Sequence, residues 1–85
     1  MDDLIRAVLE FRDERDWRRF HNPKDLAISI ALEAAELLEH FQWKTLEDVE
    51  AYVKDAGSRA RVGQEMADVL ILLISLADAA GVDLL

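Results

Sequence analysis

The fold of this chain is decided by the stretch Leu26-Ala-Ile-Ser-Ile-Ala-Leu-Glu33-Ala-Ala-Glu36-Leu-Leu38, which is apolar except at Ser29, Glu33 and Glu36. The two Glu residues are three positions apart, so on a helix they lie on one face, about one turn apart. A carboxylate on a mostly buried helix is costly unless another group compensates its charge. The stretch therefore predicts a helix that aims two acidic side chains at one point.

A second apolar stretch repeats this arrangement. Over residues 66–77 the only polar side chains are Asp68 and Ser75, and Glu65 stands just before the stretch, three positions from Asp68. Two such helices packed face to face would bring four carboxylates together, and a hard divalent cation is the natural occupant of such a cage. The two stretches together predict a metal-dependent enzyme.

Apolar spacing and capping signals predict the first half of the fold. Apolar residues recur with helical spacing over residues 3–16, which indicates a first helix. Asn22 is a good N-cap and Pro23 a good first helical residue, so a second helix should run from Pro23 to about Phe41. This helix is apolar nearly all round, and we therefore expect it to be central.

Two more helices complete the prediction. Thr45 precedes an acidic turn and should cap a short third helix. Gly57 should end it, Ser58 should cap a fourth helix that continues to Ala80, and Gly81 should follow the end of that helix. No stretch alternates with a period of two. We expect an all-α antiparallel helical bundle in which the second and fourth helices are neighbours.

Composition favours one small domain that associates with itself. The chain has 85 residues and a single Pro, which indicates one domain over residues 1–85. Its hydrophobic share of 52% is too high for disorder despite a net charge of −8. A domain of this size cannot bury all of its apolar residues, so we expect a homodimer or homotetramer.

Several classes of protein are disfavoured. The absence of Cys excludes disulfides and thiolate metal sites. The acidic start lacks the basic region of a signal peptide, and the longest apolar run, residues 69–77, is far shorter than the roughly 20 residues that span a bilayer. We expect a soluble, cytoplasmic protein without a membrane partner. The acidity disfavours binding to a nucleic acid polymer, but a metal would still allow a small phosphorylated substrate.

The acidic pairs belong to two polar stripes with helical spacing. The stripe of the second helix contains Ser29, Glu33, Glu36 and His40, and that of the fourth contains Arg61, Glu65, Asp68, Leu72 and Ser75. An oxygen-only cage favours Mg²⁺, or else Mn²⁺, over Zn²⁺. Such an ion would bridge phosphate oxygens and neutralise their charge while water attacks phosphorus.

Other interpretations of the acidic pairs stay open. Arg59, Arg61 or an Arg near Trp17 could neutralise them as ion pairs. A di-iron carboxylate site is a weak alternative, because it requires Glu-x-x-His, whereas Glu39 is the residue three positions after Glu36. Glu39 either extends the acidic set or faces solvent.

The segment between the first two helices is aromatic and basic. Its basic residues are Arg12, Arg15, Arg18, Arg19 and Lys24, and its rings are Trp17, Phe20 and His21. One interpretation is a stacking ring for a base beside cations for a phosphate chain. The other is a Trp that packs the bundle end while the Arg residues pair with nearby acids, which the residues alone favour. Trp43 poses the same choice, and we expect His21 and His40 to be hydrogen-bonded structural groups.

Five segments together resemble a known family. They are Phe11-Arg-Asp-Glu-Arg-Asp-Trp17, Phe20-His21-Asn-Pro23, Glu33-Ala-Ala-Glu36-Leu-Leu-Glu39, Phe41-Gln-Trp43 and Glu65-Met-Ala-Asp68-Val-Leu-Ile. The chain resembles the MazG-like nucleotide pyrophosphohydrolases over residues 4–84, and within that all-α superfamily it is most similar to the dCTP pyrophosphatase branch.

The resemblance implies a Mg²⁺-dependent enzyme that cleaves a dCTP-like nucleoside triphosphate between the α and β phosphorus atoms. The products would be the monophosphate and pyrophosphate, in a reaction that cleanses the nucleotide pool. By motif position, the implied metal ligands are Glu33, Glu36, Glu65 and Asp68, and the implied nucleotide contacts are Trp17, His21 and Trp43. Glu36 or Glu39 would orient or deprotonate the attacking water.

Two departures from the family pattern bear on the substrate. Leu72 stands where the family often has Tyr, so the base preference is open. Related chains usually continue with Lys and Asn residues that hold substrate, whereas this sequence stops at Leu85. Either a further segment supplies these contacts, or the chain is a minimal variant whose phosphate contacts come from Arg15, Arg18, Lys24 or a neighbouring subunit. The rival hypothesis is a non-catalytic helical oligomerisation module.

Overall fold

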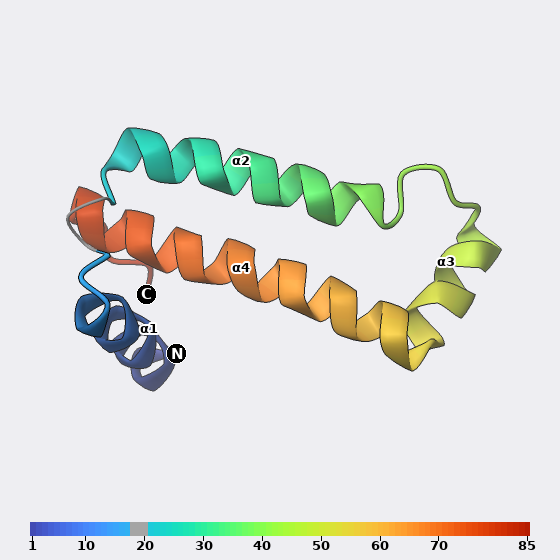
Figure 1. Ribbon diagram of the computed structural model, residues 1–85, viewed down its shortest axis with the longest axis horizontal. Helices are drawn as coiled ribbons and strands as arrows, with labels where there is room; N and C mark the ends of the chain where they lie inside the picture. Colours follow the sequence, from blue (N-terminus) through green and yellow to red (C-terminus); the bar gives the residue numbers. More distant parts are fainter. Residues whose placement is uncertain (18–20) are drawn as a thin grey trace.

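The structure is a computed structural model that describes residues 1–17 and 21–85. Its helices are α1 (Asp2–Glu14), α2 (Pro23–Glu39), α3 (Leu46–Lys54) and α4 (Ala56–Ala80). The described residues contain no strand, so the predicted all-α class is confirmed. α2 and α4 lie side by side and run antiparallel, while α1 crosses near the C-terminal end of α4 and α3 lies at its other end (Figure 1).

The central helix is α4. It packs against α1, α2 and α3. It also supplies most of the buried residues among those described, namely Ser58, Val62, Ile74, Ser75 and Ala77. On α2 only Leu26 is buried, while Leu32 is 63% exposed and Leu38 is 52% exposed. The prediction that the second helix is central was wrong, because α4 covers one side of α2 and leaves its other apolar side chains uncovered.

Three helix caps were predicted, and two of them are present in the structure. Asn22 Oδ1 accepts a hydrogen bond of 2.9 Å from the backbone N–H of Asp25, and Thr45 caps α3 in the same way, so both predicted caps are confirmed. The predicted cap at Ser58 was wrong. Asp55 caps α4, and its Oδ2 accepts bonds of 2.9 Å from both the N–H and the hydroxyl of Ser58. The carboxylate of Asp55 is a more favourable N-cap than the hydroxyl of Ser58, because its charge also interacts favourably with the positive end of the helix dipole.

α1 ends two residues earlier than predicted because it closes with a Schellman motif. Asp16 takes the left-handed conformation with φ of 54°, and its N–H donates to the carbonyl of Asp13 at 3.1 Å. The N–H of Trp17 donates to the carbonyl of Arg12 at 3.1 Å. This pair of bonds defines the motif, and it commonly brings together apolar side chains on either side of the helix end.

α4 ends with the same motif at the predicted place. Gly81 has φ of 69°, a conformation that Gly adopts without steric cost. The N–H of Val82 donates to the carbonyl of Ala77 at 2.8 Å, and that of Gly81 to the carbonyl of Asp78 at 3.2 Å. The predicted end of the fourth helix is therefore confirmed.

Large apolar side chains remain on the surface of the single chain. Trp43 and Leu46 are each 88% exposed, and both lie near the junction of α2 and α3. Across the described ranges, no helix combines the length and apolar character needed to cross a membrane. The predicted excess of apolar surface is thus present, while its covering by a second copy stays a prediction.

The core position of Ile74, a residue that is 1% exposed, yields a stability test. Ile74→Ala should lower the free energy of unfolding by about 2–4 kcal/mol, because it removes buried methyl groups and leaves a cavity. The control Glu50→Ala alters an exposed polar position on α3 and should change it by less than about 0.5 kcal/mol. Urea unfolding followed by circular dichroism, at one protein concentration, measures both. Equal losses in the two variants would contradict the placement of Ile74.

Candidate metal centre

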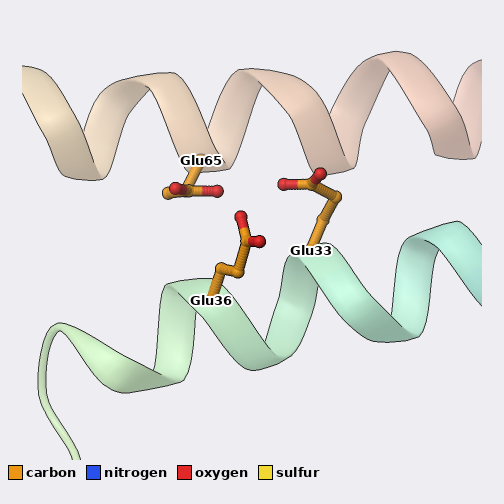
Figure 2. Close-up of side chains that lie close together, drawn as sticks. All are labelled: Glu33, Glu36 and Glu65. Atoms are coloured by element: carbon orange, nitrogen blue, oxygen red, sulfur yellow. The ribbon is translucent and has the colours of Figure 1, made fainter.

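Three carboxylates from two helices meet between α2 and α4. Glu33 and Glu36 come from α2 and Glu65 comes from α4. Each offers one carboxylate oxygen, and these three atoms lie within 4.8 Å of one another. Figure 2 shows the three side chains pointing toward one another across the space between the helices. The three-residue spacing puts both α2 carboxylates on one face, and the antiparallel packing places Glu65 opposite them.

The carboxylates of this cluster are partly withdrawn from water. Glu33 and Glu65 are half-buried, whereas Glu36 is exposed. The Oε2 atoms of Glu33 and Glu65 are buried, and neither has a hydrogen-bond partner among the residues that the structure describes. Buried polar atoms are nearly always paired in folded proteins, so two unpaired carboxylate oxygens in one place indicate a missing partner.

In the described part of the chain, no arginine forms an ion pair with the carboxylates of this cluster. The ion pairs found there are those of Arg12 with Asp13 and Asp78. Arg61 instead donates to the hydroxyl of Ser58 at 3.2 Å. Within residues 1–17 and 21–85, the alternative in which basic side chains neutralise the acidic cluster is therefore wrong.

Crowding of negative charge raises the pKa of Glu33 to about 7. The largest cause is the adjacent carboxyl of Glu65, with which a protonated Glu33 can share a hydrogen bond. Burial is the next cause, and the negative charges of Glu36, Asp68 and Glu65 add to it. Near neutral pH the cluster thus holds a proton part of the time, which a bound cation would replace.

The cluster fits a hard divalent cation. Its donors are carboxylate oxygens alone, two of them buried and unpaired, and such donors suit Mg²⁺ or Mn²⁺. The structure brings together three of the four expected ligands. The fourth, Asp68, is exposed and lies outside the group of three oxygens, although its charge acts on Glu33.

A pocket of about 420 Å³ adjoins the carboxylates, and its lining residues are Phe11, Trp17, Glu33, Asp68, Ile71 and Leu72. Its aromatic wall comes from the end of α1, where the rings of Phe11 and Trp17 meet edge to face with centroids 5.4 Å apart. Sequence reasoning missed Phe11 as a site residue. The available signal was its place at the start of Phe11-Arg-Asp-Glu-Arg-Asp-Trp17, one of the five segments singled out from the sequence.

The other site residues expected at this end of the molecule differ in their burial and in their contacts. The guanidinium of Arg15 lies 3.5 Å above the ring of Phe11, and Lys24 is exposed in the first turn of α2. His21 is half-buried, and its Nδ1 has no hydrogen-bond partner within the described ranges, contrary to expectation. Burial, and then the positive charge of Arg12, lower the pKa of His21. Arg18 lies outside the described residues.

The remaining expected site residues lie at the other end of α2. Trp43 belongs to the turn after this helix, and Glu39 is its exposed last residue, outside the cluster of three oxygens. His40 shares a hydrogen bond of 2.6 Å with the hydroxyl of Tyr52 through Nδ1, as expected of a structural group. One copy of the chain does not bring Trp43 beside Trp17.

Comparison with known proteins shows the family to which this chain belongs. A family model described as the MazG-like family matches residues 28–85. The chain is 40% identical over 84 residues to human dCTP pyrophosphatase 1 and 39% identical to the bovine protein of that name. These matches cover 99% of this chain but only 49% and 50% of the relatives, so the chain spans about half of their length.

A solved structure shares the fold. It is the crystal structure of a pyrophosphatase from Archaeoglobus fulgidus, which is 45% identical in sequence and superposes with a TM-score of 0.81. The match covers 98% of this chain and 76% of that one. The resemblance noted from the sequence motifs is therefore confirmed.

The raised pKa of Glu33 predicts how the stability of the metal-free protein depends on pH. Between its ordinary pKa of 4.5 and about 7, the folded protein keeps a proton that the unfolded chain has released. The proton bound to Glu33 therefore stabilises the folded state. This stabilisation is fully present below pH 4.5 and is lost as pH rises through about 7. Glu33→Gln cannot titrate, so its melting temperature should fall less over this range.

Melting temperatures measured in EDTA across this range test the prediction. Glu50→Gln, which neutralises an exposed carboxylate on α3, is the matched control and should follow the unsubstituted protein. Adding Mg²⁺ above pH 7 should raise the melting temperature, because the ion binds the folded state alone. An identical pH dependence in the unsubstituted protein and Glu33→Gln would refute the assignment.

Proposed function

Because this chain belongs to the MazG-like family, we propose that it is a nucleoside triphosphate pyrophosphohydrolase. The reaction is hydrolysis of the bond between the α and β phosphates, which yields the nucleoside monophosphate and pyrophosphate. The observation that supports it best is the cluster of Glu33, Glu36 and Glu65, with no basic partner in the described residues, beside an aromatic pocket.

The substrate and the cation depend on one another in this proposal. A triphosphate is strongly negative, and so is the protein, with a net charge of −8. The two would repel each other unless a cation at the carboxylates inverts the local field. Mg²⁺, with Mn²⁺ as a substitute, would be held by Glu33, Glu36 and Glu65, with Asp68 as a fourth ligand. When bound, it would neutralise phosphate charge and, as a Lewis acid on phosphate oxygens, make the phosphorus more open to attack by water.

The side chains around the cluster take separate roles. Glu36 is the most exposed carboxylate of the three, so it can orient the attacking water or accept its proton, a role for which Glu39 is the alternative. The ring of Trp17 offers a face for the base, and His21 lies on the same connector. Arg15 and Lys24 are exposed cations near this end and can contact phosphate oxygens, as can Arg18.

A nucleotide contact by Trp43 requires a neighbouring subunit. α2 has 17 residues and is therefore about 25 Å long, and Trp17 and Trp43 lie beyond its opposite ends. The exposed apolar residues Trp43, Leu46 and Leu32 favour such an association, as a homodimer or homotetramer. In that assembly Trp43 of one copy can reach the pocket of another.

dCTP is the first substrate to test, because the curated relatives are named dCTP pyrophosphatase 1. Leu72 lines the pocket and gives this part of the wall an apolar surface without a hydroxyl group. A screen of canonical and modified deoxynucleotides for pyrophosphate release, with and without EDTA, tests the proposal. Release that requires Mg²⁺ supports it. No release from any nucleotide favours the rival hypothesis, a non-catalytic helical oligomerisation module.

Glu36→Gln tests the cluster directly. The substitution keeps the shape of the side chain and removes its charge, so kcat should fall by at least about a hundredfold, as for the loss of an acid–base group. Glu50→Gln, the same change at an exposed position on α3, should keep the full rate. Pyrophosphate release at saturating nucleotide measures both, and circular dichroism checks that the fold is kept. Full activity in Glu36→Gln would overturn the proposed site.

A further inference from the structure

A partly buried ion pair joins α1 to α4. Arg12 is 4% exposed, which is unusual for an arginine in so small a protein. One guanidinium nitrogen donates to Oδ2 of Asp78 at 2.7 Å, and two others donate to Oδ1 of Asp13 at 2.8 and 3.0 Å. The side chain of Asp78 is 34% exposed, so the pair is sheltered on the arginine side and partly hydrated on the other.

The pair connects two helix ends of the same kind. The backbone carbonyl of Arg12 accepts the N–H of Trp17, and that of Asp78 accepts the N–H of Gly81. Each residue therefore belongs to a Schellman motif through its backbone and to the ion pair through its side chain. A shift of the side chains would move the end of α1, and with it the start of the connector.

Apolar packing alone leaves α1 incompletely fixed on α4. A hollow of about 230 Å³ lies between the two helices, lined by Ala7, Val8, Phe11 and Ile71. Phe11 and Ile71 also line the pocket beside the carboxylates. This hollow is open to solvent, so Ala7, Val8 and Phe11 make fewer apolar contacts with α4 along this part of the helix pair than closely packed helices would. A directional contact such as an arginine–carboxylate pair supplies that constraint.

We propose that the Arg12–Asp78 ion pair is a positioning device for the nucleotide pocket, which holds Trp17 against Phe11 and opposite the carboxylates. The inference rests on the proposed function, because it assigns the aromatic wall to nucleotide binding. Arg12 does not line the pocket, so it acts through Trp17. The positive charge of Arg12 also acts on His21, so this residue of the connector lies near the pair as well.

Trp17 fluorescence tests the inference without turnover. The chain has two Trp residues, so Trp43→Phe leaves Trp17 as the single reporter. In that background, Arg12→Met keeps an unbranched apolar side chain and removes the ion pair. Its Trp17 emission should shift to longer wavelength and become more accessible to acrylamide. Arg12→Lys should restore part of both signals, and Arg6→Met, at an exposed position of the same helix, should change neither.

The kinetic test uses the same substitutions with Trp43 retained. Arg12→Met should raise KM for dCTP about tenfold and leave kcat within about twofold, because the nucleotide loses a wall while the carboxylates stay in place. Mn²⁺ binding, followed by electron paramagnetic resonance, should be unchanged. A general loss of structure would instead lower kcat and Mn²⁺ binding together, and that result overturns the inference.

Two further outcomes are decisive. If Arg12→Met does not fold, the same measurements are made on Asp78→Asn, which keeps the side-chain shape, and unchanged Trp17 signals there overturn the inference. If the unsubstituted chain releases no pyrophosphate from any nucleotide, the proposed function fails. The Trp17 signals would still show whether the ion pair positions this residue.

Discussion

The crowding of three carboxylates between α2 and α4 determines the chemistry that this fold can carry out. Two carboxylate oxygens are buried there without a partner in the described residues, at a distance that forces Glu33 to hold a proton at higher pH than usual. A fold that merely needed stability would place apolar side chains at these positions. The antiparallel pair of helices keeps the carboxylates together, and a bound cation would relieve their repulsion.

The second part of the site comes from the ends of helices. The carboxylates sit on regular helix, where rotamers and spacing are well defined, whereas the aromatic wall depends on how α1 terminates and on how it is held against α4. Sites on regular elements are more rigid than sites on connecting segments. This difference explains why an ion pair at the boundary between α1 and α4 matters for the pocket.

The sequence predicted what local chemistry decides. The spacing of Glu33 and Glu36, the caps at Asn22 and Thr45 and the end at Gly81 follow from short-range rules, and all appear in the structure. It did not predict what depends on competition or on tertiary packing. Asp55 displaced Ser58 as the cap of α4, and α4 took the central place because its length lets it contact every other helix. The ion pair of the buried Arg12 with Asp78 joins residues too far apart in sequence for any spacing rule.

The carboxylate cluster should bind one divalent cation and give up a proton in doing so. Calorimetric titration of the chain with Mn²⁺ near pH 7, repeated in buffers of different ionisation enthalpy, measures the affinity and the proton release together. We predict saturable binding with proton release, both abolished when Glu33 and Glu65 are replaced by Gln. Binding that is weak, releases no proton and survives these replacements would contradict the account.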